Sequence, residues 1–206
     1  MNRKFISKSN YVLRKVLNSE DKLDILKNFI ESILEIDIKR IKLNPYLYRK
    51  SRTLPAEDNF GIADVRVVKE DDEEVNIGVQ IIDGNYISTK MFLYMAQIHS
   101  NQVEYDDYRK IAKTITINIL DFKYSNQKGC HNEIYLKNDD DYMKNYFEMH
   151  ILELPKFIVK DNINNNKEAW ISYFKGENLK EAIEKNAMVK KLDDLLSKYW
   201  EEEVMN

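Results

Sequence analysis

Two apolar stretches carry the residues whose types and spacing suggest chemistry: FGIADVRVV at residues 60–68 and VNIGVQII at residues 75–82. Asp64 interrupts the first stretch, and Gly78 and Gln80 interrupt the second. Hydrolysis of a phosphodiester with Mg²⁺ requires hard oxygen ligands, which hold the ion, the attacking water and the phosphate. An aspartate on one strand, a second carboxylate on the next strand and an amide two residues further on would supply such a site. Asp64 is therefore a candidate metal ligand, and Gln80 is a candidate partner in catalysis.

The alternation of side chains along the two stretches decides which of these residues meet. Successive strand residues point to opposite faces of a sheet, so Asp64 shares a face with Arg66, and Gly78 shares a face with Gln80. The acidic run between the stretches predicts a turn near residues 71–73, and the resulting β-hairpin places Asp64 opposite Gly78 or Gln80. A purely structural alternative stays open, in which Arg66 or a backbone amide satisfies Asp64 and Gln80 faces solvent.

The remaining elements follow from hydrophobic periodicity and from the positions of proline and glycine. Helical spacing predicts helices within residues 9–34 and 86–104, and β-rich runs predict strands at 38–43 and around 115–119. A strand, a long helix and a further strand form a crossover unit, so the strand around 115–119 should lie parallel to an earlier one. A short strand, a strand-like run ending at Pro155 and helices split at Gly176 complete the chain. The expected fold class is α/β, with a mixed sheet, a hairpin, a crossover helix and C-terminal helices.

Composition limits the classes of protein that fit. The 206 residues suffice for one domain of ordinary size with a short appendage, and 43% hydrophobic residues allow a real core. A formal charge of −3 gives no global positive field, so a DNA partner would have to meet a local patch. The single cysteine, Cys130, excludes an intramolecular disulfide. We expect a cytoplasmic protein without membrane contact, because neither a signal-peptide-like start nor a long apolar run is present.

Other polar residues receive plainer interpretations. The three histidines, His99, His131 and His150, lack the mutual spacing of a zinc site, so we expect them on polar surface or at an edge of the core. Glu153 and Lys156 lie in the segment LELPK and are expected to form a local structural pair or to belong to an interface.

The chain resembles the PD-(D/E)XK nuclease superfamily, in particular the group of Rpn-type recombination-promoting nucleases and putative transposases. The likeness covers roughly residues 9–175, and it depends on the order and spacing of several stretches rather than on one motif. It implies a restriction-endonuclease-like core with the order helix, three strands, helix, strand, which agrees with the order read from periodicity. The stretches are SNYVLRKVL, LDILKNFIESIL, FGIADVRVV, VNIGVQII, KMFLYMAQIHSNQVEYDDYRKIAKTITINILDF and EMHILELPKF, followed by Trp170.

The departures from the family pattern concern its active site. Gly78 stands where the Glu-x-Gln motif of the family has its glutamate, whereas Gln80 is kept. Asn10 replaces a frequent aspartate of the opening helix, Asn59 replaces a lysine before the strand aspartate, and Lys90 replaces an arginine of the later helix. The family's first acidic ligand is therefore retained, and its carboxylate partner is missing.

The resemblance implies a site in which Asp64 binds Mg²⁺ or Mn²⁺ and acts with Gln80 in catalysis, while Lys90 and Arg66 contact DNA. Asp83 or Glu31 is a candidate to replace the missing acid.

Two functions follow from this site. The first is metal-dependent cleavage of DNA phosphodiesters in recombination or mobile-element activity, weakened by the missing acid. The alternative is a catalytically inactive module that binds DNA or a protein and regulates an active relative. DNA is the expected partner, and a second copy of the chain or a related family member is a further candidate. The expected division is a nuclease-like domain at residues 1–160 and a C-terminal helical extension at residues 161–206.

Overall fold

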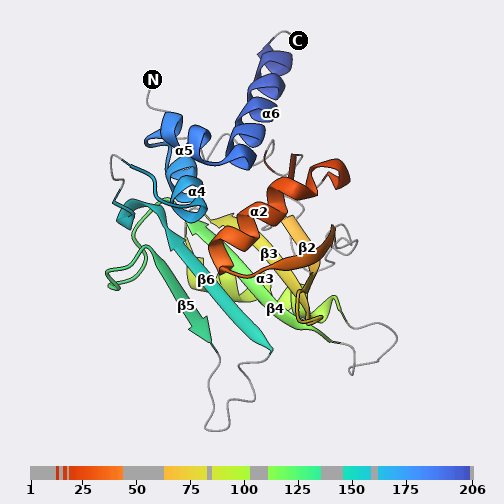
Figure 1. Ribbon diagram of the computed structural model, residues 1–206. Helices are drawn as coiled ribbons and strands as arrows, with labels where there is room; N and C mark the ends of the chain where they lie inside the picture. Colours follow the sequence, from red (N-terminus) through yellow and green to blue (C-terminus); the bar gives the residue numbers. More distant parts are fainter. Residues whose placement is uncertain are drawn as a thin grey trace.

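The computed structural model describes residues 13, 16–17, 19–43, 63–82, 85–102, 111–135, 146–158 and 162–204, with only the backbone given for Asp64 and residues 200–204. Helices and strands follow one another in the predicted order (Figure 1). The elements are η1 (Glu20–Lys22), α2 (Leu23–Leu34), β1 (Ile38–Leu43), β2 (Ala63–Lys69), β3 (Glu74–Ile82), α3 (Ile87–Ser100), β4 (Lys113–Leu120), β5 (His131–Tyr135), β6 (Phe147–Glu153), η5 (Leu154–Lys156), α4 (Asn166–Lys175), α5 (Leu179–Lys185) and α6 (Ala187–Val204).

The strands form one mixed sheet of six strands in the order β1-β2-β3-β4-β6-β5. β2 and β3 pair as an antiparallel hairpin, and β4 lies parallel to β3 after the crossover through α3, so both predictions are confirmed. β6 lies parallel to β4, and β5 pairs antiparallel with β6 at the edge of the sheet. The described part of the chain therefore has the mixed α/β sheet that the family resemblance implies.

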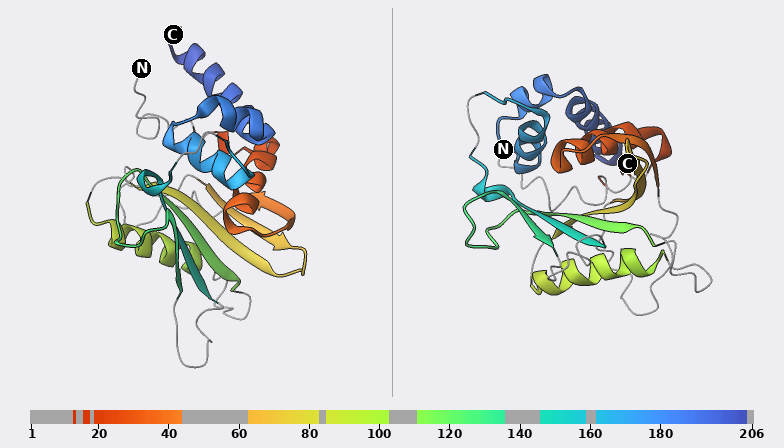
Figure 2. Two further views of the ribbon diagram at one scale, coloured as in Figure 1. Left: turned by 60° about the vertical axis from the view of Figure 1, so that its left-hand side comes forward. Right: turned by 60° about the horizontal axis from the view of Figure 1, so that its bottom comes forward.

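Helices cover both faces of this sheet, and each face has its own chemistry. The right-hand view of Figure 2 shows α3 beneath the sheet, with α2 and the C-terminal helices above it. The upper face is aliphatic: side chains such as Val65, Ile77 and Ile117 are fully buried in the main core with α2, α4 and α6. The face beneath is mixed, because buried polar side chains of β3 and β4 lie beside a smaller cluster of apolar residues from α3, β4 and β6. The sheet thus separates an apolar layer from a layer that mixes polar and apolar side chains.

The C-terminal helices belong to the same core as the sheet. The indole of Trp170 on α4 meets the ring of Phe29 on α2 edge-on, with centroids 5.3 Å apart, and its Nε1–H donates to Asn28 Oδ1 at 3.0 Å. The side-chain amide of Asn186 donates to the same oxygen at 2.9 Å. Gly176 ends α4 at a φ of 76°, in the left-handed region, which confirms the predicted split. The expected boundary at residue 160 falls outside the described residues.

Several features of the sequence lie where nothing is described. The departures at Asn10 and Asn59, the loop at residues 44–59 and the candidate acid Asp83 belong to these parts of the chain. Within the described segments, no helix combines the length and the apolar character that crossing a membrane requires.

Candidate functional site

The hairpin brings the sequence-predicted site residues into register. Asp64 on β2 lies directly opposite Gly78 on β3, and β4 runs alongside, with Thr116 beside Gly78 and Asn118 beside Gln80. Residues paired across neighbouring strands project from the same face of a sheet. The α3-facing side of β3 and β4 therefore carries a row of polar residues that leads from Gly78 toward Gln80.

This polar row is buried rather than solvated. Gln80 and Asn118 are both fully inaccessible to solvent, and the Gln80 amide Nε2 donates to Asn118 Oδ1. Asn118 Nδ2 donates in turn to the carbonyl oxygen of His150 at 3.0 Å and lies 3.3 Å from Thr116 Oγ1. The structural alternative of a solvent-facing Gln80 is therefore wrong. Gln80 Oε1 is buried without a hydrogen-bond partner in the structure, and an atom of this kind is one that a water or a cation would satisfy.

Side chains of α3 fill the space above Gly78. A Cβ atom built on Gly78 would lie 2.1 Å from Cδ1 of Ile98 and 2.8 and 2.9 Å from the hydroxyl and Cε1 of Tyr94. All three separations fall below any normal van der Waals contact. Glycine at this position is therefore what allows α3 to lie so close to β3, and any side chain placed here would require Ile98 and Tyr94 to move.

The Tyr94 hydroxyl also contacts the backbone beside Asp64 and Gly78. It lies 3.1 Å from the carbonyl oxygen of Ala63, next to Asp64, and 3.3 Å from that of Val79, which separates Gly78 from Gln80. Two backbone oxygens therefore converge on one point, and a phenol hydroxyl occupies it. Tyr94 itself is almost completely buried. A cation that used the Val79 carbonyl would have to displace this hydroxyl.

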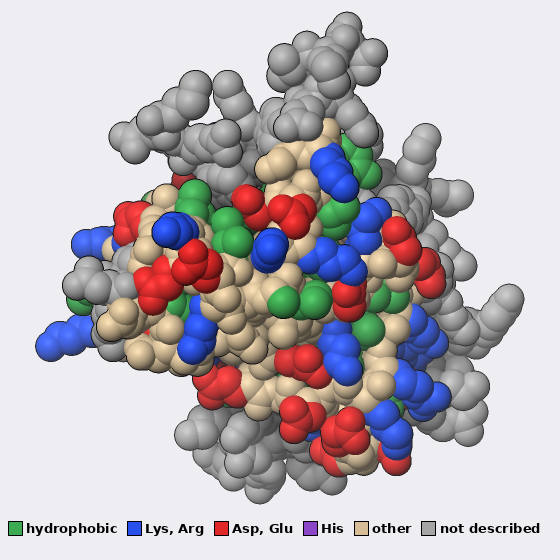
Figure 3. Space-filling view, turned by 45° about the horizontal axis from the view of Figure 1, so that its top comes forward, with side chains coloured by type: hydrophobic (Ala, Val, Ile, Leu, Met, Phe, Trp, Pro, Cys, Tyr) green, Lys and Arg blue, Asp and Glu red, His purple; other side chains and the backbone are tan. Residues whose placement is uncertain are grey.

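The predicted DNA contacts and the substitute acid have different surroundings. The Arg66 guanidinium pairs with the Glu74 carboxylate at 2.8 Å, and Lys90 lies half-buried in the first turn of α3. Glu31 lies on α2, across the sheet from α3, where its carboxylate accepts from the Ile38 N–H at 3.0 Å. Glu31 therefore does not supply the missing ligand at Gly78. Figure 3 shows acidic and basic side chains interspersed over the face formed by α2 and the C-terminal helices, rather than one positive field.

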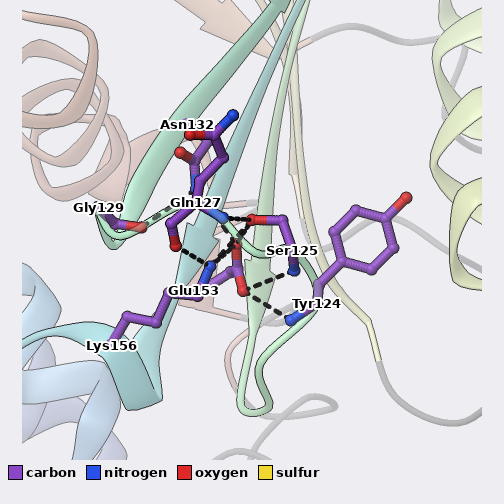
Figure 4. Close-up of polar contacts among 7 residues, drawn as sticks. All are labelled: Tyr124, Ser125, Gln127, Gly129, Asn132, Glu153 and Lys156. Atoms are coloured by element: carbon purple, nitrogen blue, oxygen red, sulfur yellow. Dashed lines mark hydrogen bonds and ion pairs between the residues drawn. The ribbon is translucent and has the colours of Figure 1, made fainter.

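A second polar cluster fixes the end of β6. The Glu153 carboxylate, fully buried, accepts from the backbone N–H groups of Tyr124 at 2.6 Å and Ser125 at 3.1 Å and from Lys156 Nζ at 2.7 Å (Figure 4). Burial acts to raise the pKa of Glu153, but the hydrogen bonds from Lys156 and Ser125 outweigh it and hold that pKa below its usual value. The predicted local pair is confirmed, and it clamps the loop after β4 onto the end of β6.

The sequence spacing of the histidines gave no sign of a shared site, yet two of the three meet in the structure. His131 on β5 and His150 on β6 face each other, with 2.8 Å between Nε2 of the first and Nδ1 of the second. Glu133 pairs with His150 across the two strands, and the potential ligand atoms of these three residues lie within 4.8 Å of one another. Sequence spacing failed because the residues meet through strand pairing. The available signal was alternation on one strand face, in His131-x-Glu133 and Glu148-x-His150.

The comparison with protein families agrees with this architecture. The sequence model of the PD-(D/E)XK nuclease family transposases matches residues 7–204, which is nearly the whole chain. No curated protein and no solved structure matches it. The family match extends through the C-terminal helices, which share the core of the sheet. The chain therefore belongs to the PD-(D/E)XK nuclease family of transposases.

Proposed function

We propose that this chain is a DNA-binding member of its family that no longer cleaves DNA through a two-carboxylate metal centre. One observation carries the proposal: the space in which a second acid would stand, above Gly78, is filled by Ile98 and Tyr94. The family is a nuclease and transposase family, which supports DNA as the partner. Arg66 and Lys90 remain the candidate contacts to DNA, whereas Asp64 and the buried Gln80 remain residues of this site without a hydrolytic role.

The residues around Gly78 do not fit the Mg²⁺ or Mn²⁺ of an active relative. Mg²⁺ prefers an octahedral set of oxygens that includes one or two carboxylates. Among the described side chains, none on the α3-facing side of β3 and β4 provides a carboxylate near Gly78, and the Val79 carbonyl accepts from Tyr94. Within the part of the chain that the structure describes, Asp64 would be the single acid, so these residues offer no second acidic ligand.

A binding and cleavage assay tests the proposal directly. The full chain is titrated into a fluorescent DNA duplex at two salt concentrations, and it is incubated with supercoiled plasmid in Mg²⁺ or Mn²⁺, beside Asp64→Asn and Lys90→Gln. We expect affinity that falls as salt rises, because phosphate contacts release counterions. We expect weaker binding by Lys90→Gln and no nicking by any of the three proteins. A chain that binds no DNA at either salt concentration overturns the proposal in favour of a module that binds a protein partner.

Metal-dependent cleavage is the second candidate, and one observation favours it. The buried Gln80 Oε1 lacks a partner, and Gln80 shares its face of β3 with Gly78, the backbone pairing partner of Asp64. Plasmid nicking by the unmodified chain that disappears in Asp64→Asn would establish this candidate and reject the first.

A gain-of-function variant sharpens the distinction. Gly78→Glu restores the acid of the family motif, and Ile98→Ala and Tyr94→Phe remove the two closest of the three atoms around it, Ile98 Cδ1 and the Tyr94 hydroxyl. Under the first proposal, the triple variant gains Mn²⁺-dependent nicking over the double variant Ile98→Ala/Tyr94→Phe, provided that both show the same far-UV circular dichroism. A folded triple variant that binds DNA and gains no nicking argues that the missing acid is not the cause of inactivity.

A further inference from the structure

The edge of the sheet holds a cluster of nitrogen and oxygen donors that the proposed function does not use. His131 and Glu133 alternate along β5, and His150 lies opposite Glu133 on β6. His150 Nδ1 is 2.8 Å from His131 Nε2 and 3.9 Å from Glu133 Oε1, so one imidazole nitrogen faces both other donors. Two imidazoles and one carboxylate converging on a point are a donor set typical of zinc and related transition metals.

The neighbours of His150 select the tautomer that a metal requires. Its Nε2 lies 2.6 Å from Glu148 Oε1, and Lys113 holds the other oxygen of that carboxylate at 2.5 Å. A carboxylate accepts hydrogen bonds, so Nε2 carries the proton, and neutral His150 presents the lone pair of Nδ1 toward His131 and Glu133. Ligating histidines in metal proteins are commonly oriented by a carboxylate in this way.

The other ligands have comparable support. The Tyr135 hydroxyl donates to Glu133 Oε2, which leaves Oε1 turned toward His150. His131 is half-buried at the sheet edge, and its Nε2 approaches His150 from β5. Each of two ligands thus has a second residue that fixes its orientation, an arrangement that a chance meeting of polar side chains does not require.

The carboxylates around the cluster outnumber the ammonium groups. Three carboxylates, those of Glu133, Glu148 and Glu35, face two ammonium groups, those of Lys113 and Lys167. Both ammonium groups are paired, Lys113 with Glu148 at 2.5 Å and Lys167 with Glu35 at 2.9 Å. The remaining negative charge belongs to Glu133, which is itself one of the donors.

We propose that His131, Glu133 and His150 bind a divalent transition metal, with Zn²⁺ as the representative ion. Zn–N distances of about 2.0–2.1 Å place two tetrahedral ligands about 3.3 Å apart, so the imidazoles separate by about 0.5 Å on binding. The metal replaces the hydrogen bond between the two rings, and the Nε2 proton of His131 moves to its Nδ1. It ties the edge strand β5 to β6 and keeps a fourth coordination position for water on the side of the half-exposed Glu133.

The site is separate from the candidate DNA site. His150 pairs with Ile117 and projects from the face of the main core, whereas Gln80 and Asn118 project toward α3. Two strands, β4 and β6, lie between β3 and β5. The proposed metal site therefore does not depend on whether the chain binds or cleaves DNA.

Isothermal titration of the full chain with Zn²⁺, and with Mg²⁺ as a comparison, tests the site without any DNA. We expect one Zn²⁺ per chain and no uptake of Mg²⁺. Glu133→Gln removes the most exposed ligand with little risk to folding and should weaken Zn²⁺ binding, and His131→Asn should abolish it. Glu148→Gln touches no metal and should weaken binding about 10–100-fold by loosening His150. Co²⁺ should give the intense visible bands of a tetrahedral site in the unmodified chain and not in His131→Asn.

His99→Gln is the matched control, because His99 is also half-buried and bonds Thr114 Oγ1 at 2.9 Å on the opposite face. It should bind Zn²⁺ as the unmodified chain does. Circular dichroism of each metal-free variant separates lost binding from lost folding. Absence of Zn²⁺ binding by the unmodified chain, or equal binding by Glu133→Gln, His131→Asn and His99→Gln, would overturn the proposal and leave a hydrogen-bonded histidine pair.

Discussion

The close approach of α3 to Gly78 predicts that even a single added methyl group destabilises the protein. In Gly78→Ala, the new Cβ meets Ile98 Cδ1 at 2.1 Å and the Tyr94 hydroxyl at 2.8 Å. Turning Ile98 out of its rotamer costs about 0.5–1.5 kcal/mol. Shifting a hydroxyl that bonds two carbonyls costs about one hydrogen bond, roughly 0.5–1.5 kcal/mol. Alanine recovers about 0.5–1 kcal/mol, because glycine is unfavourable within a strand.

With the middle of each range, the balance is a loss of about 1 kcal/mol of unfolding free energy, at the lower end of the roughly 1–3 kcal/mol seen for overpacked cores. For a chain of 206 residues, this corresponds to a melting temperature lower by roughly 2–4 °C. Urea unfolding followed by circular dichroism measures the change. The expected loss of stability is opposite to the effect of replacing glycine by alanine in open surroundings, which stabilises a protein by about 0.4–1 kcal/mol.

Gly129→Ala is the matched control, because a Cβ there would meet only the His131 carbonyl oxygen at 3.5 Å and Asn132 Oδ1 at 4.0 Å. Its stability should be unchanged or slightly raised. A second control is Ile98→Val, which removes the nearest atom. The losses of unfolding free energy in Ile98→Val and in Gly78→Ala should sum to more than the loss in the double variant, because the two sites are in contact. If Gly78→Ala unfolds at the same urea concentration as the unmodified chain, the argument that α3 closes this position is refuted.

Three further variants test other parts of the structure. Tyr94→Phe removes the hydroxyl shared by two carbonyls, one at the start of β2 and one within β3, and urea unfolding should show a loss of about 1–2 kcal/mol. Asn28→Ala leaves two donors from the C-terminal helices without their acceptor, so about 2–4 kcal/mol should be lost in one transition that fluorescence and circular dichroism report alike. Glu153→Gln breaks the buried pair with Lys156 and should cost about 3 kcal/mol at pH 7, whereas Lys39→Gln, at an exposed pair, should cost less than about 1 kcal/mol. The pKa of Glu153 is lowered in the folded state, so its contribution to stability is complete above its usual pKa of 4.5 and is lost as the pH falls. The difference in unfolding free energy between Glu153→Gln and the unmodified chain should therefore become smaller in acid.

Periodicity and turn residues were sufficient to predict the sheet. The acidic run near Asp72 predicted the hairpin, and Asp72 takes a φ of 64° at that turn. Alternating isoleucines at 115, 117 and 119 predicted β4, and the helix before it predicted the parallel pairing with β3. These features depend on local chemistry and on chain connectivity, both of which a single sequence contains.

The surroundings of the site depend on contacts between distant elements, which the sequence does not state. Nothing in VNIGVQII indicates that Tyr94 and Ile98, on a later helix, occupy the space over Gly78. The residues next to Gln80 in the sequence do not tell whether its side chain faces solvent. In the structure, this side chain bonds a buried amide on β4. The meeting of His131 with His150 likewise depends on the register of β5 against β6. The sequence therefore predicted the secondary structure but not the packing of side chains between elements.

The glycine beneath α3 limits which substitutions residue 78 can accept. A glutamate at residue 78 introduces a side chain that meets Ile98 and Tyr94, so it needs compensating changes on α3 before or together with the acid itself. Each of those compensating changes alone removes packing between α3 and β3. The first step toward an acid at this position is therefore destabilising.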